Sequence, residues 1–195
     1  MKTEVHEKET QVRPRAGTES GFSKPDALPE EVRKRVEAAG TPGPAHQALG
    51  ALVGDWKAEV KCWMDPGEPP QVSQGKAHAG MAFKGRFLEE EFYGEMMGRP
   101  FTGRTLLGFD NTKQTFNSVW VSDTQTSLFV SEGKGDHGYK TITLEGRASC
   151  AGSGRTDVPM KTVYRVISPD KHILEMFDAS KGGNAKTMEI TYTRQ

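Results

Sequence analysis

From Trp56 to the end of the chain, apolar and polar residues alternate with a period of two, and turn-forming residues recur about every 8 to 15 positions. A period of two places successive side chains on opposite faces of an extended strand. The pattern is clear in the first such segment, where Trp56, Ala58 and Val60 alternate with lysine and glutamate. This segment ends at residues 65–70, Asp-Pro-Gly-Glu-Pro-Pro, which cannot continue a hydrogen-bonded ladder. The pattern therefore predicts an all-β domain.

Ten strands are expected from the alternation and the turns between them. Their approximate ranges are 56–62, 72–83, 86–93, 101–109, 114–121, 126–133, 139–147, 158–167, 172–178 and 186–194. Short antiparallel strands that follow one another with almost no helix between them favour a single up-and-down barrel, because closure leaves no strand edge exposed. A β-sandwich is the alternative.

A tryptophan, Trp56, opens the first predicted strand, and an arginine, Arg194, closes the last. Such a pair shuts one end of a small barrel when the indole lies under the guanidinium plane. We therefore expect Trp56 and Arg194 to form the structural closure of the barrel. Any ligand would then enter from the opposite end.

The chain before the barrel divides into two predicted segments. Residues 1–27 contain few larger apolar side chains, too few to offset the entropy of ordering the backbone, and are predicted to be a disordered tail. Residues 28–44 are predicted to form a short amphipathic helix and a linker, with Pro29 at the first turn and Gly40 as the stop. The helix is either a lid or docking element or, more simply, a weakly packed arm. The barrel domain is predicted over residues 45–195.

The charge balance and the cysteines exclude several classes of protein. The chain has 26 basic and 26 acidic residues, and its basic residues are scattered, so nucleic acid and anionic membranes are not expected partners. The sequence has neither a long apolar window nor an apolar leader segment, so we expect a soluble, cytoplasmic protein. Cys62 and Cys150 lie far apart, which supports neither a disulfide framework nor a zinc knuckle.

Several segments together carry a resemblance to a known family. They are residues 46–56, the Cys-Trp-Met-Asp-Pro-Gly turn at 62–70, residues 85–88, the Gly-Phe-Asp-Asn hairpin in 100–111 and the ending 186–194. With these segments the chain resembles the bacterial family DUF1579, a domain of unknown function, over residues 46–194. The resemblance implies a calycin-like barrel, related in architecture to lipocalins, fatty-acid-binding proteins and nitrobindins. It implies no activity and supplies no catalytic residues.

A closed barrel of this size encloses either a packed core or a cavity for one small ligand. If Trp56 faces inward, strand alternation also turns several methionines and aromatic residues inward, among them Met160. The residues that we expect to contact a ligand are Glu90, Phe92, Arg104, Trp120, Tyr164, Met176 and Tyr192. Methionine adapts to irregular apolar shapes, and Tyr and Trp add a polar tip that orients a ligand. The same side chains also suit an ordinary core, and this alternative stays open.

Three consecutive acids, Glu89, Glu90 and Glu91, resemble a catalytic carboxylate cluster. Neighbours on a strand face opposite sides, so Glu90 faces inward if Phe92 does. A buried carboxylate needs a partner or a shifted pKa, and Arg104 on the following strand is the best partner that the sequence offers. The simpler alternative is an acidic strand that faces solvent.

The histidines give little support for a metal or haem site. His46, His78, His137 and His172 lie in four separate segments without metal-ligand spacing, so we expect no metal and no cofactor. His172 shares the parity of the inward-facing residues on its strand, and axial haem ligation there is the less favoured alternative. A nucleophile elbow is also absent from the sequence, and the catalytic residues, if any, are unknown.

Three functions remain compatible with the sequence. The first is the binding of a small apolar or amphipathic ligand inside the barrel. The second is an isomerase, cyclase or hydrolase that uses the interior, with Glu90, Tyr164 or His172 as acid or base. The third is an interaction module with a filled barrel, such as a homodimer formed through exposed strand faces or the helical arm.

Overall fold

The computed structural model describes residues 28–195 except 66, 97, 151–152 and 181–184. The tail predicted over residues 1–27 lies outside the described residues. The first element is a helix, α1 (Glu30–Gly40), close to its predicted range. The chain divides into two units after Val36, and the second unit, Glu37–Gln195, contains the whole β-sheet.

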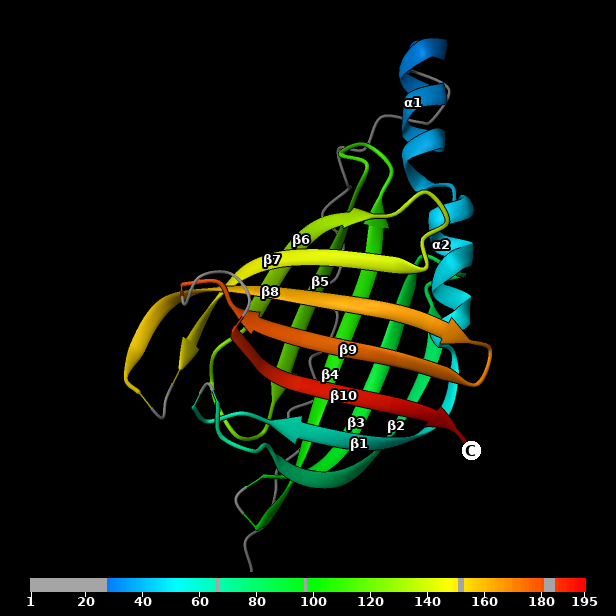
Figure 1. Ribbon diagram of the computed structural model, residues 1–195. Coiled ribbons are helices and arrows are strands. Elements are labelled where there is room, and N and C mark those ends of the chain that lie inside the picture. The colour runs from blue at the N-terminus through cyan, green and yellow to red at the C-terminus, as the bar shows by residue number, and fades with distance from the viewer. Residues whose placement is uncertain (1–27, 66, 97, 151–152, 181–184) are drawn as a thin grey trace, which may run out of the picture. The chain divides into compact units, whose positions relative to one another are not determined.

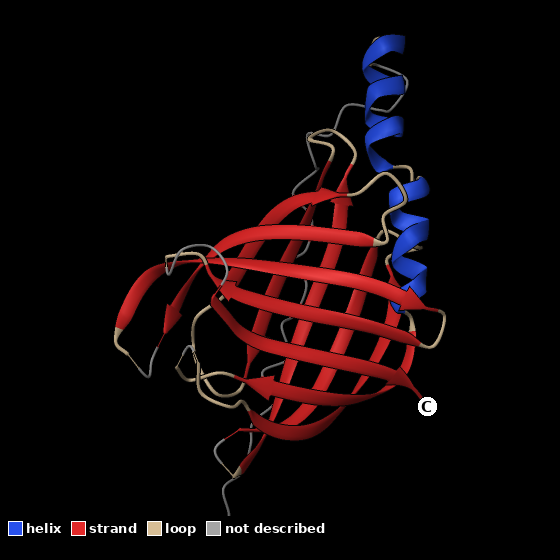
Figure 2. Cartoon of the chain, in the orientation of Figure 1, coloured by secondary structure: helices blue, strands red, loops and turns tan. Residues whose placement is uncertain are grey.

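Ten strands form a closed barrel (Figure 1). They are β1 (Gly54–Cys62), β2 (Gln71–Ala82), β3 (Phe87–Met96), β4 (Arg99–Asp110), β5 (Thr115–Ser122), β6 (Phe129–Gly135), β7 (Thr141–Cys150), β8 (Arg155–Ser168), β9 (Lys171–Asp178) and β10 (Ala185–Arg194). Each strand pairs antiparallel with the next one in the chain, and β10 pairs with β1. The strands drawn red in Figure 2 make up the wall. The predicted up-and-down barrel is confirmed, and the β-sandwich alternative is wrong.

A short helical segment precedes the first strand. It consists of α2 (Pro44–Ala48) followed directly by the 3-10 helix η2 (Leu49–Leu52). The backbone N–H of Gly43 donates to Nδ1 of His46 at 3.0 Å, which ties down the start of α2. The buried side chains of Ala45, Leu49 and Leu52 join the barrel core. This segment therefore packs against the core at the end of the barrel where β10 finishes (Figure 1).

The strand register decides which residues share the inner face. Trp56 lies opposite Arg194 on one side and Ala77 on the other. Trp56 is fully buried, so the residues paired with it face inward as well. The buried hydrophobic cluster follows this face around the barrel, from Trp56 on β1 through Leu88 on β3 to Leu144 on β7. The core is therefore the inside of the barrel.

Candidate functional site

Trp56 and Arg194 contact each other at one end of the barrel. The guanidinium carbon of Arg194 lies 4.2 Å from the centroid of the Trp56 ring. The guanidinium also donates to the carbonyl oxygens of Val53, at 3.0 Å, and Pro169, at 2.8 Å. The indole Nε1 of Trp56 donates to the carbonyl oxygen of Leu52 at 3.0 Å, so the preceding 3-10 helix is bonded to the same group. These contacts cover this end with side chains and backbone, and it is called the closed end below.

His172 on β9 is packed between two rings at the closed end. Its imidazole stacks on Tyr192 with centroids 4.2 Å apart and meets the edge of Trp56 at 4.4 Å. Burial, with a smaller effect of the Arg194 charge, lowers the pKa of His172 to about 3, so the ring is neutral. Its Nδ1 is buried without a hydrogen-bond partner among the described residues. In the described part of the chain, no group of three or more His, Cys, Asp or Glu side chains could hold a metal ion.

Polar side chains from four strands meet in the interior. Glu90 on β3 accepts a long hydrogen bond, 3.5 Å, from the hydroxyl of Tyr192 on β10. Tyr164 on β8 is hydrogen-bonded to Ser118 on β5, and its hydroxyl is close enough to Glu90 for the two groups to interact electrostatically. Glu90, Ser118, Tyr164 and Tyr192 are called the interior polar cluster below.

Burial sets the protonation of the interior polar cluster. It raises the pKa of the Glu90 carboxyl to about 7, and the hydrogen bond from Tyr192 opposes this in part. The pKa of Tyr192 is raised well above 10 by burial and by its neighbours Glu90 and Tyr164. The pKa of Tyr164 is raised by burial and by Glu90. Near neutral pH both phenols are therefore protonated donors, whereas the carboxyl is present in both its neutral and charged forms.

The expected pair of Glu90 with Arg104 does not form. In the β3–β4 register Glu90 lies opposite Thr105, and Arg104 lies opposite Glu91. Arg104 therefore shares the outer face with Glu91, and its Nη2 lies 2.7 Å from that carboxylate. The side chain of Arg104 is 71% exposed, so this residue is corrected from an interior contact to a surface ion pair.

The other predicted ligand contacts lie on the inner face. Phe92 and Tyr164 are buried, whereas Trp120 and Met176 keep part of their surface exposed. The indole of Trp120 lies directly over Gly103 of β4, where a Cβ atom would overlap the ring. Gly103 lies opposite Phe92 in the register, so these two aromatic side chains come from neighbouring positions of the wall.

Some inward side chains far from the closed end are only half-buried, as are Met81, Phe109 and Val166 nearer to it. Residues near the far ends of their strands that are only half-buried are Cys62, Trp120, Met160, Met176 and Met188. Cys62, Met188 and Met176 lie side by side in the register, so together they form one stretch of the inner wall. We refer to this side of the interior as the open end, a name that marks its position opposite the closed end. Glu90 is half-buried as a whole residue, whereas its carboxyl group is buried within the interior polar cluster.

Small polar residues of the interior were not predicted from the sequence. Thr105, Ser118, Ser131 and Thr162 are all buried, and the hydroxyl of Thr162 has no hydrogen-bond partner among the described residues. A serine or threonine in an alternating strand looks like a solvent-facing residue. The signal that was available is parity, since Ser118 is two residues from Trp120.

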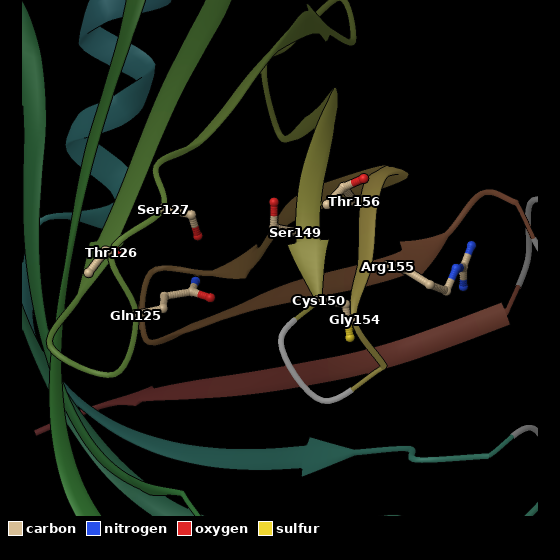
Figure 3. Close-up of a pocket in the computed structure, with 8 residues that line it drawn as sticks. All are labelled: Gln125, Thr126, Ser127, Ser149, Cys150, Gly154, Arg155 and Thr156. Carbon is tan, nitrogen blue, oxygen red and sulfur yellow. The ribbon is translucent and has the colours of Figure 1, made fainter.

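Two pockets lie away from the interior polar cluster. One, of about 380 Å³, is lined by the β5–β6 loop, by the end of β7 and by the start of β8, including Gln125, Cys150 and Arg155 (Figure 3). The other, of about 260 Å³, is lined by residues around His137 and Tyr139. Neither pocket contains a member of the interior polar cluster. In the described part of the chain, helices are all too short or too polar to cross a membrane.

The chain is similar to solved structures of other proteins. Among solved structures, the chain is similar to the crystal structure of Rv2717c from M. tuberculosis, with 17% identity and a TM-score of 0.58, covering 80% of this chain and 99% of that chain. It is also similar to a redesigned β-barrel, mFAP0, bound to DFHBI, with 16% identity and a TM-score of 0.42, covering 74% of this chain and 99% of that chain. At 17% identity, the similarity to Rv2717c shows the fold alone. The TM-score of the similarity to mFAP0 is below 0.5, too low to support an inference.

No curated protein matches the chain. The family model described as "Protein of unknown function (DUF1579)" matches residues 41–194, which include every strand of the barrel. This match confirms the resemblance that the sequence motifs indicated. The chain therefore belongs to the DUF1579 family.

Proposed function

We propose that the protein binds a small apolar or amphipathic molecule inside the barrel. The observation that carries the proposal is the interior polar cluster, because Glu90, Tyr164 and Tyr192 meet in an interior that is lined mainly by apolar side chains. Polar groups are costly to bury in a core that only has to pack, and a few convergent polar groups in an apolar lining are typical of ligand sites. The half-buried side chains of the open end lie on the expected route of entry.

The expected strength of binding follows from the apolar lining. A ligand that buries about 300 Å² of apolar surface gains roughly 7 kcal/mol before the costs of ordering it. This is enough for micromolar affinity at best. The hydrogen bonds of the interior polar cluster would then orient the ligand more than they strengthen its binding.

Calorimetric titration with decan-1-ol, an uncharged amphipath, tests the proposal. Met176 faces the interior, so Met176→Trp should fill the space and lower the affinity at least tenfold. Phe177 is the next residue on β9 and faces outward beneath the ammonium of Lys161, which lies 4.5 Å from its ring centroid. Phe177→Trp is therefore the matched control and should bind as the unaltered chain does. Equal binding by the two variants, or lack of binding by the unaltered chain, would contradict the proposal.

Catalysis is a second candidate, favoured by one observation. The pKa of Glu90 is raised by burial to about 7, which is the range in which a carboxyl both gives and accepts protons readily. An isomerase, cyclase or hydrolase would use Glu90 as acid or base, with Tyr164 as a donor. A substrate turned over with a bell-shaped pH–rate profile that is lost in Glu90→Gln would support this candidate. Binding of the same molecule without turnover would argue against it.

A further inference from the structure

The charged groups of the inner wall are unevenly distributed. Glu90 lies within the interior polar cluster, and Asp178 is buried on the inner face of β9 at the open end. The inward positions within residues 75–81, 101–109, 116–122, 129–135 and 142–148 carry no charged side chain. Among the residues that the structure describes, acidic side chains therefore reach the inner wall at these two positions.

The cations nearest to the interior are already held by other groups. The Arg194 guanidinium is bonded to backbone carbonyl oxygens and lies over Trp56 at the closed end. At the open end, Arg155 pairs with Asp178 at 3.2 Å and donates to the hydroxyl of Ser180 at 2.8 Å. His172 is neutral near pH 7 because burial lowers its pKa. The described inner wall therefore offers a carboxylate ligand no uncommitted positive charge.

The surroundings of Glu90 instead suit a positive charge. The titratable groups that face it are the hydroxyls of Tyr164 and Tyr192, and His172 lies behind Tyr192. Two other titratable side chains face inward toward the open end: Cys62, whose thiol pKa is raised by burial, and Asp178, which is paired with Arg155. Phe92 and Tyr192 are 6.5 Å apart, centroid to centroid, and aromatic ring faces attract cations. The hydroxyl of Thr162, which has no hydrogen-bond partner among the described residues, is a further acceptor on the inner wall.

Resting on the proposed ligand binding, we infer that the interior selects amphipathic molecules with a primary ammonium head group over those with a carboxylate. The ammonium lies against the Glu90 carboxylate, and its apolar chain runs past Trp120 and Met176 toward the open end. A ligand ammonium would give the Glu90 carboxylate a cationic partner in addition to the Tyr192 hydroxyl, whereas a ligand carboxylate would be repelled by Glu90. An alcohol of the same length is neither attracted nor repelled.

Calorimetry at pH 8 with decylammonium, decan-1-ol and decanoate, each at micromolar concentration, tests the inference. Decylammonium should bind at least tenfold tighter than decan-1-ol, and decanoate should bind most weakly. Glu90→Gln should weaken decylammonium binding at least tenfold and change decan-1-ol binding less than threefold. Glu91→Gln is the matched control, because Glu91 faces outward and pairs with Arg104, and it should leave all three affinities unchanged. At pH 5.5, where Glu90 is mostly protonated, decylammonium should lose at least tenfold in affinity.

The possible failures are distinguishable. If decan-1-ol binds but decylammonium binds no tighter, or if Glu90→Gln weakens both equally, the inference is overturned and the proposed function stands. If decanoate binds tightest, the inference is overturned as well. If none of the three molecules binds, both the inference and the proposed function fail.

Discussion

Burial favours the neutral forms of both Glu90 and His172, and it therefore shifts their pKa values in opposite directions. The pKa of Glu90 is raised from 4.5 to about 7, and the pKa of His172 is lowered from 6.5 to about 3. The stability that Glu90 contributes is complete below pH 4.5 and is lost as the pH rises through 7. The stability that His172 contributes is complete above pH 6.5 and is lost as the pH falls toward 3.

Replacing Glu90 by glutamine should therefore make the protein less sensitive to alkaline pH. The raised pKa corresponds to a loss of about 3 kcal/mol in the free energy of unfolding between pH 4.5 and pH 8. Glutamine cannot ionise. The free energy of unfolding of Glu90→Gln, measured relative to that of the unaltered chain, should therefore be higher at pH 8 than at pH 5. Urea unfolding at the two pH values measures this change.

The outward neighbour provides the control for this prediction. The pKa of Glu91 is lowered by hydrogen bonds from Tyr93 and Arg104, so its charged form is the favoured one. Glu91→Gln should not gain stability at pH 8. If Glu90→Gln and Glu91→Gln respond alike, burial in the barrel does not raise the pKa of Glu90.

The sequence predicts which face of a strand a side chain occupies better than it predicts which residue that side chain contacts. The period of two places Glu90, Phe92 and Tyr192 on the inner face without knowledge of the register. The partner of Glu90 depends on the register between β3 and β4, in which Thr105 lies opposite it. A shift of one residue would have brought Arg104 to the inner face, but it would also have turned Phe101, Leu107 and Phe109 outward. The alternation along this strand therefore already favours an outward Arg104.

At the scale of elements, the turn between β4 and β5 does more than join two strands. The carboxylate of Asp110 accepts from the backbone N–H groups of Thr112 and Lys113 at 2.7 and 3.0 Å. The side chain of Asn111 donates to the carbonyl oxygens of Ala38 and Thr41 at 3.1 and 2.7 Å. This Asp-Asn pair, one of the family motifs, therefore ties the segment around residues 38–41 to the barrel.

Asn111→Ala should cost about 1–2 kcal/mol in the free energy of unfolding, because backbone carbonyl groups lose their donor. Amide hydrogen exchange should increase around residues 38–43, while ligand binding in the interior stays unchanged. Asn117→Ala is the control, since its side chain donates at 3.3 Å to Thr115, two residues away on the same strand. Unchanged exchange around residues 38–43 in Asn111→Ala would contradict this assignment.

Element types were predicted well where a pattern covers many residues. The alternation extends over whole strands, so errors at their ends did not alter the count or the order of the strands. The packing of α2 and η2 depends instead on a few side chains, such as Leu49, that contact residues distant in sequence. The family resemblance marked this segment as characteristic, but the segment on its own does not specify which strands it packs against.

At the scale of the whole molecule, the barrel has two different ends. Trp56, Arg194 and the α2–η2 segment cover one end, and half-buried methionines and Trp120 line the interior toward the other. The interior polar cluster lies on the wall between them. This asymmetry is the reason to expect a ligand whose head group points inward and whose apolar chain points toward the open end.

The location of a bound amphipath tests this account most directly. In crystals of the chain grown with 10-bromodecan-1-ol, the anomalous signal of bromine marks the end of the apolar chain. The account predicts a bromine peak at the open end beside Met160, Met176 or Met188, with the hydroxyl within hydrogen-bonding distance of Glu90, Tyr164 or Tyr192. A bromine peak on the outer surface alone, or a barrel interior completely filled by side chains, would contradict it.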